Sequence, residues 1–290
     1  KRLKMTEFIH FILNFLSSCY LIEAATFTQL SSGADVNASI YKAQTSDQKT
    51  YFVKVKQDHF HEINIAILEL LQTAGIQQII PPIKTLEGKQ VLQTEDFSLI
   101  VYPFIEGQDG FNRSLTDEQW IALGRAIKQV HEVDVPLSLK NQIRREEFSP
   151  KWRNIVRSLY TDIEIVPISD DISGNLWKFL QEHRSTIQHI VERAEQLSQM
   201  ASSRPLEFVL CHSDIHGGNV LIDSKGSLYI VDWDDPILAP KERDLMFIGA
   251  GVGNVWNKPN EEKLFYEGYG QTEIDWTLLT YYRYERIVED

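Results

Sequence analysis

The sequence has little cysteine, no long apolar run and a shortage of basic residues. Its two cysteines, Cys19 and Cys211, cannot build the disulfide framework of a small secreted domain, so we expect a cytoplasmic protein. No stretch is long and apolar enough to span a bilayer, so we expect no membrane partner. Lysine and arginine number 29 against 41 acidic residues, which gives a net charge of −12. This charge argues against a nucleic-acid partner and suits a cationic small substrate, although it serves general solubility equally well.

The first apolar segment, residues 8–16, could be a signal peptide or a helix. It is interrupted by His10, and Phe8, Ile12 and Phe15 recur at helical spacing. The pattern favours an amphipathic helix packed on the body of the protein. The length of 290 residues allows a large core that can divide into two lobes.

Three polar residues have the spacing of a phosphoryl-transfer site. Residues 212–219 read HSDIHGGN and contain Asp214 and Asn219, and Asp232 follows after a further apolar run. Kinase-type catalytic loops read H-x-D-x-x-x-x-N, followed later by an Asp that binds metal. In that chemistry the first Asp accepts the proton of the attacking hydroxyl. The Asn and the second Asp offer the hard oxygen ligands that Mg²⁺ prefers.

The segments between these residues predict a hairpin. Residues 220–222 and 228–231 are apolar and strand-like, and residues 223–227 form a polar turn that contains glycine. A hairpin places Asn219 and Asp232 at the same end. A role in which Asp214 and Asp232 only cap turns would not explain this placement.

The same letters permit a different chemistry. His212, Asp214 and His216 alternate, so on an extended strand they would share one face and could bind zinc or a pair of metal ions. A metallohydrolase of this kind would leave Asn219 and Asp232 unused. The alternative roles are structural: His212 would shape the loop through backbone hydrogen bonds, and His216 would support it.

Residues 210–249 resemble the aminoglycoside phosphotransferase family, a branch of the protein-kinase-like fold, and the likeness extends over nearly the whole chain. Within the family the chain is most similar to the spectinomycin phosphotransferases, in residues 149–153, 238–244 and 253–259. The resemblance implies an α+β, bilobal fold. A small N-terminal lobe with an antiparallel β-sheet and helices would cover residues 1–104, and a larger, mainly helical C-terminal lobe residues 105–290.

The resemblance also implies ATP and Mg²⁺ as cofactors. Asp214 would be the catalytic base, and Asn219 and Asp232 the Mg²⁺ ligands. The family usually has glycine where this chain has Ser213. It also usually continues with further helices beyond the point that corresponds to Asp290.

The nucleotide is expected to bind the N-terminal lobe. Residues 24–57 alternate like strands, and the turn that contains Ser32 and Gly33 would cover the nucleotide, or would be a plain hairpin turn. Lys54 and Lys56 share one face of an apolar strand, and a buried lysine there needs an anionic partner. By likeness to the family, Lys54 is the phosphate lysine.

A helix and a hinge complete the expected nucleotide site. Glu62 opens a helical segment that ends near Gly75, and by likeness to the family it orients Lys54, with Glu69 as the alternative. Tyr102 and Phe104 lie where the last strand of the lobe runs into a hinge whose backbone would bind adenine.

The remaining sequence is mostly helical. Thr116 and Gln119 form a capping box that opens a helix to His131. Residues 176–200 predict one long amphipathic helix, and Asp244 would brace the catalytic loop or cap a helix. The apolar positions that we expect in the core are Leu176, Phe179, Leu180, Ile187, Ile190 and Val191.

A cationic substrate would be recognised by carboxylates and aromatic faces. Asp234, Trp256, Tyr266 and Tyr269 are the main candidates, although core packing explains each of them as well. Further residues of the right type are Asp235, Glu267, Tyr281 and Tyr282.

Three functions remain open on these observations. The first is an ATP-dependent phosphotransferase that acts on a hydroxyl of an aminocyclitol or aminoglycoside antibiotic, spectinomycin above all, and confers resistance. The second is a kinase of the same fold for a metabolite such as choline, homoserine or methylthioribose. The third is a non-catalytic nucleotide-binding protein. A protein kinase fits less well, because Trp233 follows Asp232 where protein kinases have Phe-Gly.

Overall fold

The chain folds into two compact α+β units, each built from segments that are distant in the sequence. In this computed structural model, residues 5–30, 38–57, 61–163 and 171–290 are described. The first unit contains Lys1–Ser114, Val135–Gln142 and Gly218–Asp234, and the second contains Leu115–Asp134, Ile143–Gly217 and Asp235–Asp290. Among the described residues no helix is long and apolar enough to cross a membrane.

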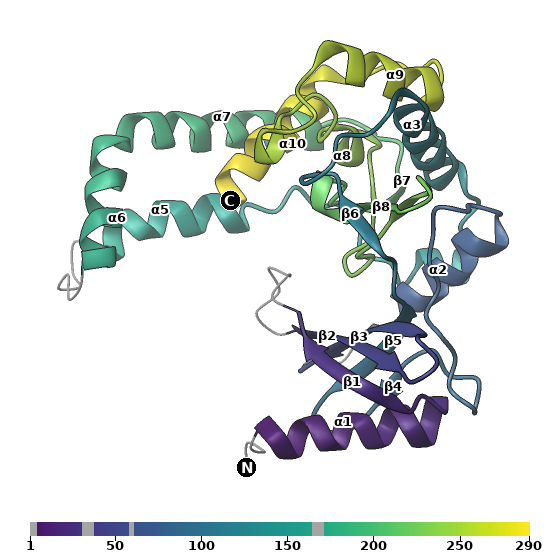
Figure 1. Cartoon of the computed structure of the whole chain (residues 1–290). Helices are drawn as coiled ribbons and strands as arrows, with labels where there is room; N and C mark the ends of the chain where they lie inside the picture. The colour runs from purple at the N-terminus through teal and green to yellow at the C-terminus, as the bar shows by residue number, and fades with distance from the viewer. Residues whose placement is uncertain (1–4, 31–37, 58–60, 164–170) are drawn as a thin grey trace. The chain divides into compact units, whose positions relative to one another are not determined.

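A five-stranded antiparallel sheet and a helix form the centre of the first unit. Helix α1 (Met5–Tyr20) lies along one face of the sheet (Figure 1), where Ile12 and Leu16 pack against Val53 and Val55. The expected amphipathic helix is therefore confirmed. The strands run in the order β1-β2-β3-β5-β4, with bounds β1 (Ala24–Gln29), β2 (Ala38–Thr45), β3 (Thr50–Lys56), β4 (Leu92–Gln93) and β5 (Ser98–Pro103).

A second, smaller sheet belongs to the same unit. It has the order β6-β8-β9, with β6 (Gly107–Asp109), β8 (Val220–Asp223) and β9 (Leu228–Ile230), so the predicted hairpin is confirmed. Strand β6 comes soon after the expected hinge in the chain. A Cβ at Gly107 would lie 2.1 Å from the carbonyl oxygen of Ile222, so the close pairing requires glycine. The unit also contains α2 (Glu62–Thr73) and α4 (Leu137–Lys140).

The second unit is mainly helical. Thr116 and Gln119 form the predicted capping box at the start of α3. Helices α3 and α9 touch through two glycines, since a Cβ at Gly124 or Gly268 would lie 2.0 or 1.9 Å from a carbonyl oxygen of the other helix. The elements are α3 (Asp117–Glu132), α5 (Lys151–Ile163), α6 (Asp171–Glu182), α7 (Arg184–Ser202), β7 (Val209–Cys211), β10 (Ile237–Ala239), α8 (Glu242–Leu245), α9 (Pro259–Tyr269) and α10 (Trp276–Glu289), with short 3₁₀ turns at Gly217–Asn219 and Val252–Asn254.

The prediction of one long helix over residues 176–200 is wrong. The segment divides into α6 and α7 at His183, whose ψ of 10° departs from helical values. Leu176 and Phe179 are about half exposed, at 52% and 55%, so they are not the core residues that we expected, whereas Val191 is buried. The helical period of the apolar residues continues across the break, and no proline or glycine marks it.

Candidate active site

Lys54 of β3 is the buried cation of the first unit. Alternation along the strand directs Val53 and Val55 into the core and Lys54 to the opposite face. The lysine is only 8% exposed, and its Nζ lies 2.8 Å from Oδ1 of Asp232 and 2.8 Å from Oδ2 of Asp234. Burial alone would lower the pKa of Lys54, but the two carboxylates outweigh it and raise that pKa. Lys54 is therefore a charged group held by two acids.

The loop after β9 holds these acids through further bonds. Nζ of Lys56 lies 2.7 Å from the same oxygen of Asp234, and the buried amide of Asn64 donates to the Asp234 carbonyl at 2.5 Å. The lysines outweigh the effect of burial and lower the pKa of Asp234. The side chain of Asp232 remains 48% exposed. Asp234 is thus bound within its own unit, and Asp232 is the more accessible acid.

The predicted metal ligands meet at one end of the hairpin. The backbone N–H of Val231 donates to the carbonyl of Asn219 at 3.0 Å, which places Asn219 beside the residue before Asp232. Asn219 is buried and Asp232 half exposed. One amide and one carboxylate are hard oxygen donors of the type that Mg²⁺ accepts together with phosphate oxygens and water, so the residues present fit this ion.

The expected glutamate partner of Lys54 is not in contact with it in this structure. Glu62 is the first residue of α2 and is exposed, and Glu69 pairs with Lys84 at 3.5 Å. The ion pairs of Lys54 within the described part of the chain are those with Asp232 and Asp234. A role for Glu62 in the nucleotide-bound protein remains a prediction.

The expected hinge follows β5. Tyr102 and Pro103 end the strand, and the N–H of Phe104 donates to the Thr50 carbonyl at 3.2 Å. Nζ of Lys42 lies 4.2 Å from the centre of the Phe104 ring. Ser32 and Gly33, the expected covering turn, lie outside the described residues. Contacts of a nucleotide with the hinge residues Tyr102 and Phe104, and with Ser32 and Gly33, remain predictions.

In the second unit a buried carboxylate fixes the loop that carries Asp214. The loop follows β7, and Asp244 of α8 accepts the N–H of His212 at 2.9 Å and the N–H of Ser213 at 2.7 Å. Burial alone would raise the pKa of Asp244, but its hydrogen bond to His131 and the bond from the N–H of Ser213 lower it. Asp244 therefore braces the loop, as we predicted. The alternative prediction, that Asp244 caps the start of a helix, is wrong because Lys241 is the N-cap of α8.

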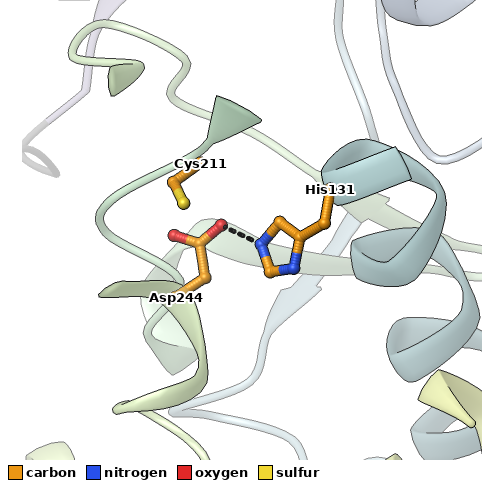
Figure 2. A group of neighbouring side chains, drawn as sticks. All are labelled: His131, Cys211 and Asp244. Carbon is orange, nitrogen blue, oxygen red and sulfur yellow. Dashed lines mark hydrogen bonds and ion pairs between the residues drawn. The ribbon is translucent and has the colours of Figure 1, made fainter. Parts of the chain in front are cut away.

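The brace extends further than the sequence indicates. Nε2 of His131, at the end of α3, lies 3.0 Å from Oδ2 of Asp244, as the dashed line in Figure 2 shows, and Nδ1 of His131 lies 2.8 Å from the hydroxyl of Tyr269. All three side chains are buried. We call the three hydrogen-bonded side chains of Tyr269, His131 and Asp244 the brace. Its signal in the sequence is weak, because His131 and Tyr269 are single residues on helices and belong to no motif.

Ser213 adopts a backbone conformation that normally favours glycine. Its φ is +76°, in the left-handed region that costs other residues about 1–2 kcal/mol. This explains why the family usually has glycine there. The Ser213 hydroxyl donates to the carbonyl of Asp235 at 2.9 Å, a bond that glycine cannot make.

Asp214 itself is held by a histidine and an arginine. Nη1 of Arg286 in α10 lies 2.8 Å from Oδ1, and Nε2 of His216 lies 3.3 Å from Oδ2. Burial alone would raise the pKa of Asp214, but the bond to His216 and the charge of Arg286 hold it at about 2. The carboxylate is therefore ionised at neutral pH. The sequence analysis missed Arg286, which no local pattern connects with residue 214.

The structure does not support the alternative zinc site at His212, Asp214 and His216. Among the described residues, the group of potential metal ligands that comes together is His131, Cys211 and Asp244, with ligand atoms within 4.8 Å of one another. Figure 2 shows the thiol beside the carboxylate. His131 and Asp244 are already engaged in the brace, and burial raises the pKa of the Cys211 thiol. These side chains are better explained as part of the buried support for the loop that carries Asp214.

Two of the four main substrate candidates are core residues. Trp256 is 5% exposed and packs edge-on against Trp120 at 5.1 Å, and Tyr269 is 2% exposed and belongs to the brace. Tyr281 and Tyr282 are also buried. Tyr266 is partly buried, which raises its pKa to about 12. Burial favours a packing role for the two core candidates, and substrate contacts of all of them remain predictions.

Comparisons with known proteins agree with these features. Residues 26–279 match the family described as "Phosphotransferase enzyme family". A solved structure of spectinomycin phosphotransferase in complex with ADP and spectinomycin is 48% identical, covers 97% of this chain and 85% of its own, and has a TM-score of 0.91. Protein StrN of Streptomyces griseus is 25% identical over 229 residues, which are 74% of this chain and 69% of StrN. An amicoumacin kinase, 17% identical with a TM-score of 0.67 over 96% of this chain and 86% of its own, shares the fold. The expected bilobal, kinase-like α+β fold is confirmed.

Proposed function

Because this chain belongs to the phosphotransferase enzyme family, we propose that it transfers the γ-phosphoryl group of ATP to a hydroxyl of an aminocyclitol antibiotic, spectinomycin in the first place. The observation that carries the substrate proposal is the 48% identity, over 97% of the chain, to a phosphotransferase solved with spectinomycin and ADP. The net charge of −12 suits a cationic acceptor. Expression in a susceptible bacterium would then confer resistance.

The nucleotide side of the reaction is assigned to the first unit. Lys54 supplies a buried positive charge for the phosphates, and Asn219 and Asp232 would hold Mg²⁺. When bound, the ion neutralises charge on the phosphate oxygens. The Lys54 contact with the half-exposed Asp232 keeps the lysine charged and aimed at the loop that carries this acid.

The acceptor side is assigned to Asp214. Its ionised carboxylate accepts a hydrogen bond from the substrate hydroxyl and orients the oxygen for in-line attack on the γ-phosphorus. The new P–O bond forms as the bond to the bridging oxygen breaks, the electron pair leaves with ADP, and the hydroxyl proton passes to Asp214. A carboxylate with a pKa of about 2 is a weak base, so the proton moves late, when the forming bond has made the hydroxyl acidic.

The test is ADP release by the full chain with ATP, Mg²⁺ and a panel of aminocyclitols, aminoglycosides and the amino-alcohol metabolites choline and homoserine. We expect release with spectinomycin, and a decrease of about 10²–10⁴-fold for Asp214→Asn. Asp96→Asn, a matched change at an exposed position of the first unit, should keep full activity. Turnover with a metabolite instead of spectinomycin would replace the substrate, and full activity of Asp214→Asn would overturn the mechanism.

A further inference from the structure

Helix α10 is fixed to the second unit by buried and partly buried charged contacts. Arg153, 1% exposed, pairs with Glu285 of α10 and with Glu195 of α7. Two residues before Glu285, Arg283 donates to the carbonyls of Met246 at 3.0 Å and Ile248 at 2.7 Å. These bonds determine both the position of the helix and its rotation about its own axis.

Arg286 follows Glu285 in the helix, and the fixed position of the helix directs it at the catalytic loop. Its Nη1 lies 2.8 Å from Oδ1 of Asp214, and its Nε lies 2.9 Å from Asp290 one helical turn on. The guanidinium also stands 5.6 Å from the centre of the Phe247 ring, which is buried and packs edge-on against His216. One aromatic ring thus supports two groups that touch the Asp214 carboxylate, Arg286 and His216.

We infer that Arg286 is a positioning residue for Asp214, which fixes one carboxylate oxygen while His216 fixes the other. This inference rests on the proposed role of Asp214 as the acceptor of the hydroxyl proton. One contact on each carboxylate oxygen prevents the carboxylate from rotating about its Cβ–Cγ bond. The two contacts leave lone pairs of the carboxylate for a further hydrogen bond. Pre-orientation of this kind matters because small misplacements of a catalytic group can cost about 10²-fold in rate.

The contact has a second consequence for a cationic acceptor. Arg286 adds positive charge beside Asp214, and Asp290 partly offsets it. Removal of the arginine should therefore slow the chemical step without weakening the binding of a cationic substrate. A purely structural role would instead alter folding and would affect every variant background equally.

The experiment compares Arg286→Gln and Arg286→Lys with the unchanged protein, using spectinomycin as acceptor. We expect kcat to fall about tenfold or more in Arg286→Gln, with the KM for spectinomycin unchanged or lower, and partial recovery in Arg286→Lys. In an Asp214→Asn background, Arg286→Gln should cause no further loss. Arg125→Gln, a matched change at an exposed position of α3, should leave kcat unaltered.

An unchanged or increased kcat in Arg286→Gln, or an equal loss in the Asp214→Asn background, would overturn the inference. If the unchanged protein turns over no acceptor, the proposed function fails, and the contact is then read by thermal unfolding without substrate. Midpoint shifts of Arg286→Gln and Asp214→Asn that do not add in the double variant support the pairing, and additive shifts refute it.

Discussion

Lys54 in the first unit and Asp244 in the second are both charged and more than nine-tenths buried, yet their surroundings differ. Lys54 is neutralised by two carboxylates, and one of them, Asp232, is half exposed. Asp244 is surrounded by backbone N–H groups and His131, all inside the unit. We propose that contacts of the first kind are exchanged for a bound phosphate. Contacts of the second kind maintain the shape of a loop at all times, because their loss would leave buried donors unsatisfied.

Asp244→Asn tests the permanent side of this comparison and should have the largest effect on folding. An amide cannot accept from two N–H groups and His131 as a carboxylate does, so we expect a loss of about 3 kcal/mol or more in the free energy of unfolding. Urea denaturation of the variant, with the exposed Asp96→Asn as control, measures the loss. A loss within the error of the control would show that the brace is not required for stability.

The acid dependence of the same variant supplies a further check. Because the pKa of Asp244 is lowered on folding, its contribution is complete above the pKa of an unfolded carboxyl, about 3.9, and is lost as the pH falls through the lower folded value. The difference in stability between Asp244→Asn and the unchanged protein should therefore shrink as the pH falls below the range of an unfolded carboxyl. A deficit that grows on acidification would contradict the direction of the pKa shift.

Lys54→Met tests the exchangeable side. If Lys54 binds the phosphates as we propose, loss of its charge should raise the KM for ATP by about 10–150-fold, equivalent to about 1.5–3 kcal/mol. The free energy of unfolding should change less than in Asp244→Asn, because Asp234 keeps Lys56 and Asp232 is half exposed to water. Lys56→Met is the matched control on the same strand, with a smaller expected effect on ATP. Equal KM values in both variants would show that Lys54 has no special role.

The sequence predicts the parts of the site that are local in the chain. The hairpin brings Asn219 and Asp232 to one end because apolar runs and a polar turn specify it, and strand alternation turns Lys54 away from the core. It does not predict partners that only tertiary packing supplies. His131 is 113 positions from Asp244, and Arg286 is 72 positions from Asp214.

The error over residues 176–200 has the same origin. The apolar period of residues 176–200 is correct for α7, but Leu176 and Phe179 of α6 are about half exposed, and periodicity alone cannot show what a helix packs against. Likewise, an aromatic residue such as Trp256 has the chemistry of a cation-binding face and of a core residue alike. Its burial against Trp120 favours the core role, and its contact with a substrate remains a prediction.

Ser213 offers a smaller test of how the loop is held. Glycine relieves the left-handed backbone but loses the hydroxyl bond to Asp235, whereas alanine loses the bond and keeps the strain. Ser213→Gly should therefore be more stable than Ser213→Ala by about 1–2 kcal/mol. Both should keep catalytic activity, because the N–H that Asp244 accepts remains. Equal thermal midpoints for the two variants would contradict the strain at this position.

Tyr269→Phe has the smallest expected effect and separates two roles for one residue. If Tyr269 serves as the far end of the brace, loss of its hydroxyl bond to His131 costs about 0.5–1.5 kcal/mol in the free energy of unfolding. The KM for spectinomycin then stays unchanged, since a side chain that is 2% exposed does not reach a ligand. If Tyr269 contacts the substrate, as its chemistry allows, the KM rises and stability is unaffected. Steady-state kinetics and urea denaturation on one preparation distinguish the two roles, and Tyr284→Phe, at a partly buried tyrosine of α10, is the matched control.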